Sequence, residues 1–457
     1  MKKTYIDEIT KATGGKLLIQ GAGNAIKGIR HDSREVGPED MFVAIKGENQ
    51  DGHRYIPQVV EKGCGAVLAS HTDGWLDEID TSKTPFNLVL VDDTIEAMGK
   101  LATWYLDSLN IRRAAVTGSV GKTSTRDMIY YVLSEKYNCG RNLKNYNNNI
   151  GLPISIFQFD ENTEAAVLEM GMDAFGEIEY LSSIVKPEIG VITNIGIAHM
   201  EKLGSREGIF RAKMEIAGNI ISRDRGGTLI FPGDPEFLTK ERTAGDYNQV
   251  EIGYDDTCDF IISNVDDFGI EGIEFDVARK GETTHVKLPA AGTHNAVNAT
   301  VALAVGEAMG VDIKEGIKGL AKAELTGSRL RKIEGNSVTI IDDTYNANPF
   351  SMMSALDVLK RSKAERKVAI LGDMFELGDD TEALHRQVGE HAREIGIDQV
   401  IAIGNLAKNI ADGAGGTHFE DKESFIDVIN DYVKPGDLVL VKASRGMKME
   451  DIVGRLK

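Results

Sequence analysis

The sequence predicts an α/β fold of several packed units, and three observations lead to this prediction. The chain has 457 residues, its apolar strand-like runs alternate with amphipathic helical stretches, and it contains 49 glycines but only 10 prolines. Because a domain typically has about 150 residues, a chain of this length favours two to four domains. Strands that alternate with helices indicate right-handed crossovers and a parallel sheet, and glycine suits the tight turns that join them.

Composition and charge indicate a folded chain and give no sign of a nucleic-acid partner. Hydrophobic residues make up 42% and charged residues 27%, and the net charge of -19 is spread without a dense block of like charge. We therefore expect no nucleic-acid partner, and no apolar run approaches the roughly 18 residues of a membrane span. Asp7 and Glu8 stand where a secretory signal needs its apolar core, and Cys64, Cys139 and Cys258 lie far apart, as packing residues in a reducing compartment do. These features predict a cytoplasmic protein, which we expect to be a monomer.

The first part of the chain, residues 1–87, is predicted to be a small mixed domain. A strand is expected at 40–45, a turn-rich segment at 46–52 and a helix through 58–62. The pattern changes after residue 87, and we place the first domain boundary there.

The next part, from residue 88, is predicted to be a parallel-sheet domain. A strand is expected at 88–91, a helix over 94–109 and a strand at 114–117 that runs into a glycine turn. The strands expected at 165–168 and 190–193 continue the same sheet.

Short alternating strands are expected between 229 and 288, for example at 273–277, and they predict an antiparallel annex. A helix follows over about 295–308. Near 325–331 the pattern changes again, so the central domain is expected to span 88–325.

A second α/β unit is predicted for 326–457. Its strands are expected at 338–341, 368–371 and 438–441. The helices between them are amphipathic; one of them would bury the face formed by Leu384, Val388, Ala392 and Ile395.

The strongest local motif is a glycine turn over 116–124 with the sequence Val-Thr-Gly-Ser-Val-Gly-Lys-Thr-Ser. It lies between an apolar strand and a helix with an apolar stripe, which is the setting of a phosphate-binding P-loop. Lys122 would reach the terminal phosphates of a nucleotide and the Thr123 hydroxyl could ligate Mg2+. The stripe consists of Met128, Ile129, Val132 and Leu133, and the phosphate-binding residues would be Gly118, Ser119, Val120, Gly121, Lys122, Thr123 and Ser124. The alternative is an ordinary glycine turn before a helix.

Two further residues could hold metal beside this loop. Glu169 follows the strand at 165–168, and His199 lies beyond the strand at 190–193. The carboxyl ends of neighbouring parallel strands meet at one edge, where ligand sites form. A solvated carboxylate and a structural histidine are the alternatives.

With these residues in view, the chain resembles the Mur ligase family, ATP-dependent enzymes that form amide bonds in peptidoglycan precursor synthesis. The resemblance rests first on the loop form Thr-Gly-x-x-Gly-Lys-Thr. This form explains why Val116 stands where the general P-loop pattern has glycine. The resemblance also rests on segments spread over nearly the whole chain. These segments are Glu-Met-Gly at 169–171, Thr-Asn-Ile-Gly-Ile-Ala-His at 193–199, Ala-Lys-Met-Glu at 212–215, Gly-Thr-His-Asn-Ala-Val-Asn at 292–298, Thr-Gly-Ser-Arg at 326–329 and Asp-Asp-Thr-Tyr-Asn-Ala-Asn-Pro at 342–349.

Four segments resemble the branch of the family that adds D-alanyl-D-alanine. They are Asn-Tyr-Asn-Asn-Asn-Ile-Gly at 145–151, Tyr-Asn-Ala-Asn-Pro at 345–349, Leu-Gly-Asp-Met-Phe-Glu-Leu-Gly at 371–378 and Lys-Ala-Ser-Arg-Gly-Met at 442–447. The branch that adds the third amino acid would carry Tyr-Ala-His-Thr-Pro and Asp-Asn-Pro-Arg segments, which this sequence lacks.

The resemblance implies three domains, with a P-loop central domain between a mixed first domain and a Rossmann-like third. It also implies that ATP phosphorylates the carboxylate of a UDP-N-acetylmuramoyl tripeptide and that the amine of D-alanyl-D-alanine attacks the acyl phosphate. Lys122 would hold the β- and γ-phosphates, Thr123 and Glu169 one Mg2+, and His199 a second. Whether the tripeptide carries lysine or diaminopimelate stays open.

Further residues receive roles from the same resemblance. Lys213 matches a lysine that some family members carry as a carbamate, and an ordinary lysine near a phosphate is the equal alternative. Asn295, Arg329 and Asp343 match positions used around the nucleotide, with Asp342 as an alternative to Asp343. Substrate contacts would come from six residues, for which surface or turn-forming roles are the alternatives; they are Ser33, Arg34, Asn147, Asn148, Asn346 and Asn348.

Two other functions are alternatives to a ligase of peptidoglycan precursor synthesis. A folate polyglutamate or cyanophycin synthetase shares the fold, but the long first domain with Asp-Ser-Arg at 32–34 is unexpected in the folate enzymes. A partner-regulated P-loop ATPase would leave the unit at 326–457 without a role.

Overall fold

The computed structural model describes residues 1–21, 23–47, 49–143, 145–196, 200–324, 330–375 and 377–457. The chain forms two compact units. The first comprises Met1–Ile252 with Val301–Gly316, and the second comprises Gly253–Thr300 with Ile317–Lys457. Among the described residues, no helix has the length and apolar character needed to cross a membrane.

The first unit begins with a five-stranded sheet in the order β2-β7-β6-β5-β4, parallel except for β2. Both faces of this sheet are covered, because Met41 and Val43 of β5 pack in one apolar cluster and Phe42 between them packs with α2 in another. The elements are β1 (Thr4–Tyr5), α1 (Ile6–Thr13), β2 (Lys16–Ile19), β3 (Ala25–Ile26), β4 (Gly28–Arg30), β5 (Asp40–Val43), η1 (Gly52–Tyr55), α2 (Ile56–Glu61), β6 (Ala66–Ala69), η2 (Leu76–Glu78) and β7 (Asn87–Leu90).

The strand expected at 88–91 is β7, but it belongs to a different sheet from the one predicted. The sequence pattern groups it with the P-loop domain, but β7 pairs with β6 and β2 in the first sheet. An apolar run predicts a buried strand without naming its neighbours, since pairing depends on contacts remote in sequence. The boundary expected between residues 87 and 88 therefore falls inside this strand, between its first two residues.

A parallel sheet forms the rest of the first unit, with strands in the order β13-β12-β11-β8-β10-β9. The stripe predicted on α4 is fully buried. The strands are β8 (Arg112–Thr117), β9 (Cys139–Arg141), β10 (Ala165–Glu169), β11 (Ile189–Ile192), β12 (Thr228–Pro232) and β13 (Asn248–Gly253). The helices are α3 (Thr94–Leu109), α4 (Lys122–Ser134), α5 (Gly151–Ile156), α6 (Glu177–Val185), α7 (Met200–Leu203), α8 (Arg206–Met214), η3 (Glu215–Asn219) and η4 (Arg223–Arg225).

The antiparallel annex expected between 229 and 288 is shorter than predicted. β12 and β13 extend the parallel sheet, and only β14 (Phe260–Asp267), β15 (Ile273–Arg279) and β16 (Glu282–Leu288) are antiparallel. The reason is that β12 carries a continuous apolar run, as a strand buried on both faces does, whereas β15 alternates buried and half-buried residues. The division between the units falls within α9 (His294–Ala308) and α10 (Ile313–Leu320).

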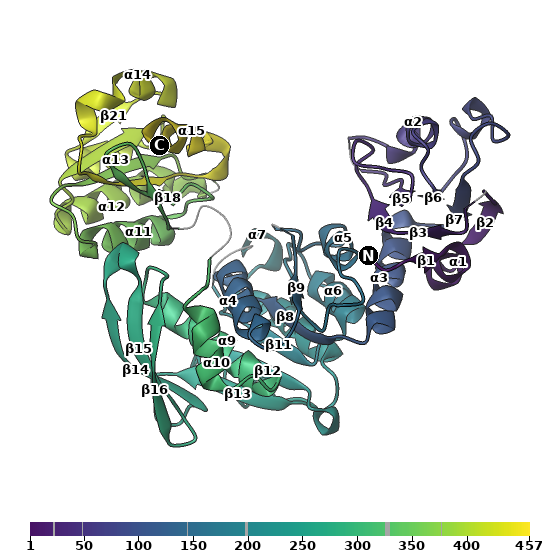
Figure 1. Ribbon diagram of the computed structural model, residues 1–457. Helices are drawn as coiled ribbons and strands as arrows, with labels where there is room; N and C mark the ends of the chain where they lie inside the picture. Colours follow the sequence, from purple (N-terminus) through teal and green to yellow (C-terminus); the bar gives the residue numbers. More distant parts are fainter. Residues whose placement is uncertain (22, 48, 144, 197–199, 325–329, 376) are drawn as a thin grey trace. The chain divides into compact units, whose positions relative to one another are not determined.

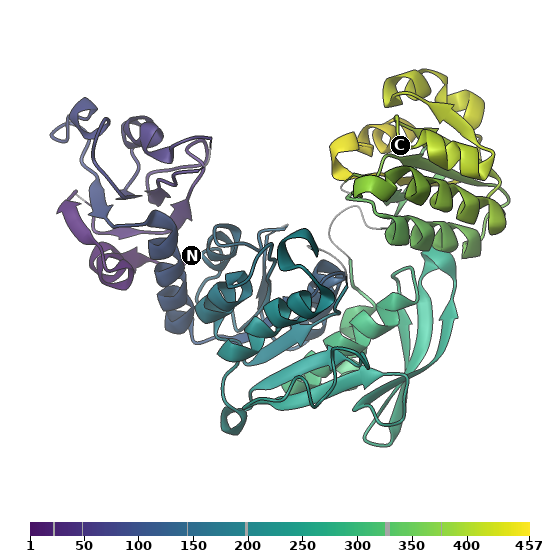
Figure 2. The same ribbon diagram turned by 180° about the vertical axis from the view of Figure 1, so that it is seen from behind.

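The second unit ends in a six-stranded sheet in the order β17-β18-β22-β19-β20-β21, parallel except for β17. Helices cover both of its faces (Figures 1 and 2), and Ile340 and Ile341 of β18 pack in the two different apolar clusters. The elements are β17 (Arg331–Glu334), β18 (Thr339–Asp343), α11 (Pro349–Arg361), β19 (Lys367–Gly372), η6 (Gly378–Asp380), α12 (Thr381–Glu394), β20 (Gln399–Ile403), α13 (Lys408–Ala414), β21 (Thr417–Phe419), α14 (Lys422–Tyr432), β22 (Leu438–Lys442), η7 (Arg445–Met447) and α15 (Glu450–Leu456).

Within the second unit, the turn between β14 and β15 lies on α11. The Asp267 carboxylate pairs with the Arg361 guanidinium at 2.6 Å, and the Ile270 N–H donates to the Ser362 hydroxyl at 2.8 Å. This turn contains η5 (Gly269–Glu271), and a Cβ on Gly269 would lie 2.4 Å from the backbone nitrogen of Ser362. The close approach requires glycine at that position.

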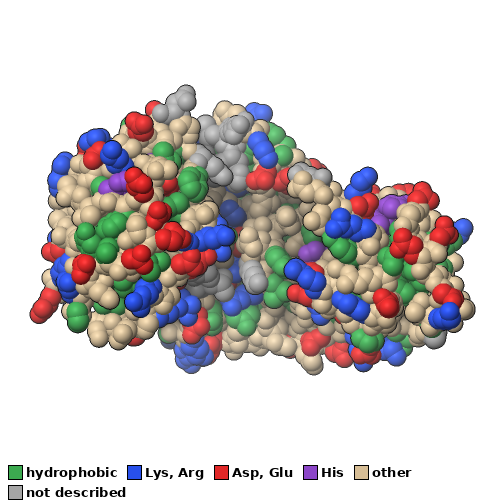
Figure 3. Space-filling model, turned by 90° about the horizontal axis from the view of Figure 1, so that it is seen from above, with side chains coloured by type: hydrophobic (Ala, Val, Ile, Leu, Met, Phe, Trp, Pro, Cys, Tyr) green, Lys and Arg blue, Asp and Glu red, His purple; other side chains and the backbone are tan. Residues whose placement is uncertain are grey.

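The surface carries charged side chains of both signs. On the face shown in Figure 3, Lys and Arg side chains are interspersed with Asp and Glu side chains rather than gathered in one large basic patch.

Candidate functional site

The glycine turn between β8 and α4 has the backbone of a phosphate-binding loop. Gly118 and Gly121 have φ of 148° and 82°, a region that favours glycine. A Cβ on Gly118 would lie 1.9 Å from the Thr193 hydroxyl oxygen, so a larger residue cannot occupy this position. The turn leads directly into α4, whose first N–H groups and positive dipole end favour an anion.

The segment after β11 fixes the shape of this loop. Asn194 accepts a hydrogen bond from the Val120 N–H at 3.0 Å and donates one to the Val120 carbonyl at 2.9 Å. The Ser119 hydroxyl accepts from the Gly196 N–H at 2.9 Å. Since β11 pairs with β8, these contacts join the ends of two neighbouring strands.

Lys122 and Thr123 open α4 at the same edge. The Lys122 ammonium donates to the carbonyl oxygens of Gly118 at 2.7 Å and Ser119 at 3.3 Å, which keeps it over the loop. Thr123 is buried. Both residues therefore start the helix where a phosphate on the loop would meet them.

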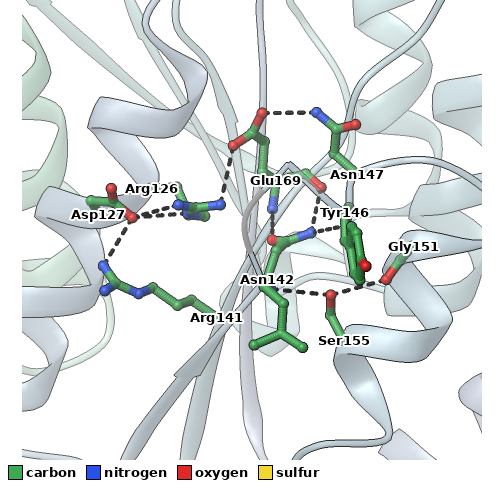
Figure 4. Close-up of polar contacts among 10 residues, drawn as sticks. Arg126, Asp127, Arg141, Asn142, Tyr146, Asn147, Gly151, Ser155 and Glu169 are labelled. Carbon is green, nitrogen blue, oxygen red and sulfur yellow. Dashed lines mark hydrogen bonds and ion pairs between the residues drawn. The ribbon is translucent and has the colours of Figure 1, made fainter. Parts of the chain in front are cut away.

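Glu169 ends β10 directly beside the strand that carries the loop, since it is in register with Val116 of β8. Its side chain is buried and its two carboxylate oxygens have different partners (Figure 4). One oxygen accepts from the Asn147 amide at 2.9 Å, and the other lies 3.4 Å from the Arg126 guanidinium. Asn142 fixes the backbone of Glu169, because its side-chain amide bonds both the N–H and the carbonyl of that residue.

A buried charge network behind Glu169 was missed by the sequence reasoning. Arg126 and Asp127 of α4 are completely buried, and Asp127 pairs with Arg126 at 2.6 Å and with Arg141 at 2.9 Å. Arg126 in turn faces Glu169, so the helix and strand β10 are joined through ions. The available signal was an adjacent Arg-Asp pair directly before the apolar stripe of α4.

Lys213 of α8 is a buried cationic group in the same unit. It is 1% exposed, and burial together with the nearby Lys122 charge lowers its pKa to about 7, although Glu215 opposes this shift. A lysine with this pKa is largely a neutral amine at slightly alkaline pH, and a neutral amine is a nucleophile.

Two predicted site residues, His199 and Arg329, lie outside the described residues. The remaining nucleotide candidates belong to the second unit. Asn295, near the start of α9, is buried; its amide donates to the Ala291 carbonyl at 2.7 Å and its oxygen accepts from Asn298 at 2.9 Å.

Asp342 and Asp343 end β18 and have different partners. Asp342 accepts from the Thr344 hydroxyl at 2.7 Å, whereas Asp343 pairs with the buried ammonium of Lys442 at 2.6 Å. Lys442 ends the neighbouring strand β22 and also donates to the Asn346 carbonyl at 2.8 Å. Sequence reasoning gave no role to Lys442, although its segment was part of the resemblance.

The asparagines proposed for the peptide substrates also have local roles. Asn348 caps α11 in a capping box with Ser351, whose N–H it accepts at 2.8 Å, and Pro349 takes the first helical position. Asn148 likewise accepts from the Gly151 N–H at 2.8 Å at the start of α5. The alternative of turn-forming asparagines therefore fits the geometry of both residues.

In the first sheet, Ser33 and Arg34 follow β4. The Arg34 guanidinium is well exposed and pairs with Asp32, which holds the pKa of that carboxyl well below its usual range. The Ser33 carbonyl accepts from the Lys62 ammonium at 3.2 Å. Both residues lie at the carboxyl edge of parallel strands, where ligands bind in open α/β sheets.

A histidine cluster in the connections of the same sheet does not suit a metal ion. The ligand atoms of Asp51, His53 and His71 lie within 4.8 Å of one another. The two rings, however, are stacked at 4.0 Å with planes 22° apart, so their in-plane lone pairs cannot converge on one ion. His53 also accepts from the Ser70 N–H through Nε2, which fixes its proton on Nδ1, facing Asp51.

The loop edge offers a donor set that fits Mg2+. Thr123 supplies a hydroxyl and Glu169 a carboxylate, and oxygen ligands together with phosphates are what Mg2+ prefers. Thr123 opens α4 directly after the loop, and Glu169 ends β10 beside β8, the strand that leads into the loop. Both side chains therefore fit an ion bound beside the loop.

Family comparisons cover nearly the whole chain. The family model "Mur ligase family, catalytic domain" matches residues 25–105, "Mur ligase middle domain" matches 116–306, and "Mur ligase, glutamate ligase domain" matches 328–445. The UDP-N-acetylmuramoyl-tripeptide–D-alanyl-D-alanine ligase of Bacillus subtilis is 38% identical over 99% of this chain and 98% of its own. The enzyme of the same name from Escherichia coli is 33% identical over 100% and 99%.

Solved structures agree with this relationship. MurF from Acinetobacter baumannii has a TM-score of 0.90 at 31% identity and covers 100% of this chain and 99% of its own. MurF from Thermotoga maritima, solved in complex with ADP, has a TM-score of 0.79 at 28% identity over 94% and 96%. The chain belongs to the Mur ligase family, in its MurF branch of UDP-N-acetylmuramoyl-tripeptide–D-alanyl-D-alanine ligases.

Proposed function

We propose that this protein is an ATP-dependent ligase that joins D-alanyl-D-alanine to a UDP-N-acetylmuramoyl tripeptide, with ADP and phosphate as co-products. The observation that carries the proposal is 38% identity along the full length of a ligase of that name. The glycine loop, with Lys122 above it and Glu169 beside it, supports the same chemistry.

The first step is phosphoryl transfer between anions. The terminal carboxylate of the tripeptide attacks the γ-phosphorus of ATP, the bond from that phosphorus to the β,γ-bridging oxygen breaks, and an acyl phosphate and ADP result. Loop N–H groups and Lys122 stabilise the charge on the phosphates, so catalysis rests on positioning and electrostatics. Thr123 and Glu169 would hold a Mg2+ ion, which would supply positive charge to neutralise the phosphates, and the resemblance assigns a second ion to His199.

The second step forms the amide bond. The amine of D-alanyl-D-alanine attacks the acyl carbon and loses a proton, and the carbon–oxygen bond to phosphate breaks. Lys213, with its pKa of about 7, could enter this site as an ordinary amine or, after reaction with CO2, as a carbamate. We favour the carbamate, because it converts a buried amine near Lys122 into an anion.

Binding roles for the other residues remain predictions. Asn295, Arg329 and Asp343 are proposed to contact the nucleotide. The six substrate contacts are proposed for Ser33, Arg34, Asn147, Asn148, Asn346 and Asn348. The domain division 1–87, 88–325 and 326–457 also remains a prediction, and the pairing of β7 argues for a first boundary after Leu90. We further infer a monomer that works in the cytoplasm.

The test is phosphate release from Mg-ATP with UDP-N-acetylmuramoyl tripeptide, with and without D-alanyl-D-alanine, followed by mass analysis of the nucleotide product. We expect turnover that depends on the dipeptide and yields a UDP-muramoyl pentapeptide. Lysine and diaminopimelate tripeptides compared side by side identify the third residue. ATP turnover indifferent to both peptides would contradict the proposal and favour a partner-regulated ATPase.

A further inference from the structure

Arg126 lies beside Glu169, one of the two proposed metal ligands, and does not belong to the loop itself. Its guanidinium is fully buried and lies 3.4 Å from one oxygen of Glu169. We propose that Arg126 is a positioning residue that fixes the Glu169 carboxylate for Mg2+ bound with a nucleotide. This inference rests on the metal role given to Glu169 in the proposed function.

The helix α4 places Arg126 where it can couple loop and metal ligand. Thr123 and Arg126 are three residues apart and therefore lie on the same face of the helix. That helix begins at the phosphate loop, and Glu169 ends the strand beside it. A displacement of Arg126 would thus change the relation between the two proposed ligands of one ion.

Hydrogen bonds to Asp127 fix the orientation of the Arg126 guanidinium. Its Nε and Nη2 atoms both donate to one oxygen of Asp127, at 3.0 and 2.6 Å, and Arg141 donates to the same oxygen at 2.9 Å. Burying these ions is costly unless they compensate one another. Arg126, Arg141, Asp127 and Glu169 thus form one network of two cations and two anions, in which the Nη1 group of Arg126 lies toward Glu169.

The contact with Glu169 orients the carboxylate and leaves it able to bind metal. A charge-assisted hydrogen bond is about 2.7–2.9 Å long, whereas Arg126 Nη1 lies 3.4 Å from Glu169 Oε2. The Asn147 amide donates to the other oxygen at 2.9 Å, so each oxygen of the carboxylate faces a donor group. An ionised carboxylate has about four acceptor positions, of which these contacts use only some.

The test measures metal binding apart from turnover. In the full-length chain with saturating ADP, Mn2+ binding is followed by electron paramagnetic resonance for wild type, Arg126→Met and Arg126→Lys. Loss of a partner that orients a metal-binding carboxylate typically weakens metal affinity by about 10- to 100-fold. We expect about 10-fold weaker Mn2+ binding in Arg126→Met and partial recovery in Arg126→Lys. ADP affinity measured without metal should stay unchanged in both.

Two further variants separate positioning from misfolding. Asp127→Asn loosens the support of Arg126 without touching Glu169, and it should weaken Mn2+ binding less than Arg126→Met does. Arg112→Met removes another arginine pair, with Glu188, at the opposite end of β8, and should leave Mn2+ binding unchanged. If Arg126→Met failed to fold, the double variant Arg126→Met with Asp127→Asn removes both charges together and tests the same prediction.

A Glu169→Gln variant distinguishes this inference from the proposed function. If Glu169→Gln weakens Mn2+ binding and a folded Arg126→Met does not, or binds Mn2+ more tightly, the positioning role of Arg126 is overturned and the metal role of Glu169 stands. If Glu169→Gln itself leaves Mn2+ binding unchanged, the metal role on which the inference rests is wrong, and the inference is overturned with it.

Discussion

Burial changes the protonation state of the Lys213 side chain, and with it the reactions that this side chain can undergo. A lysine in water has a pKa near 10.5, and burial beside Lys122 lowers that of Lys213 to about 7. Below pH 7 the folded chain therefore holds an ammonium group, and above pH 7 it holds a neutral amine. Only the amine can attack CO2, releasing one proton as the carbamate forms.

We predict that Lys213 forms a carbamate in a pH-dependent manner. After incubation with 13C-bicarbonate, a carbamate carbon resonance is expected at pH 8 and should be much weaker at pH 6, because protonation removes the nucleophile. The measurement is 13C NMR of the wild type and of Lys213→Met, which should lack the resonance. Equal signals from both proteins, or no signal at pH 8, would leave Lys213 as an ordinary amine.

At the scale of single elements, the start of α11 combines a structural and a proposed binding role in Asn348. Its side chain accepts the Ser351 N–H, and the Ser351 hydroxyl accepts the Asn348 N–H in return. A substitution can separate the two roles, because aspartate caps helices about as well as asparagine does.

We predict that Asn348→Ala lowers the free energy of unfolding by about 1 kcal/mol, the usual cost of losing such a cap. Asn348→Asp should keep the melting temperature of the wild type. If Asn348 also contacts the incoming dipeptide, Asn348→Asp should raise the KM for D-alanyl-D-alanine, because it replaces an amide donor with a carboxylate. Thermal melts and steady-state kinetics of both variants check this, and an unchanged KM would leave only the capping role.

The elements around the loop were the most predictable from sequence. The helix expected over 94–109 is α3 with the same bounds, and the stripe of α4 is buried as predicted. Local signals sufficed there, since a glycine turn between an apolar strand and an amphipathic helix specifies its own geometry. The partners of Glu169 could not be predicted in this way. Arg126 comes from α4 and Asn147 from the segment before α5, and only the folded sheet brings them to the Glu169 carboxylate.

At the scale of the whole molecule, the antiparallel strands are attached to the C-terminal sheet by a small set of contacts. Asp267 is nearly buried beneath Arg361, and Ser362 accepts the N–H of Ile270. Glu271 pairs with Lys332 at 2.9 Å. Family comparison assigns these strands to the middle domain, since that match ends at 306, although in the structure they form one compact unit with the C-terminal sheet.

We predict that these contacts make the β14–β15 turn and α11 exchange hydrogen as one cooperative region. Arg361→Met combined with Ser362→Ala removes the ion pair and the acceptor, so exchange at residues 269–271 should accelerate by up to about fivefold, as expected for contacts worth around 1 kcal/mol. The measurement is hydrogen–deuterium exchange with mass spectrometry. Arg279→Met, which affects a contact with Asp259 elsewhere on the same strands, is the matched control and should leave residues 269–271 unchanged. Unaltered exchange in the double variant would mean that the turn is held by its other contacts, the Glu271–Lys332 ion pair and the close approach of Gly269 to Ser362.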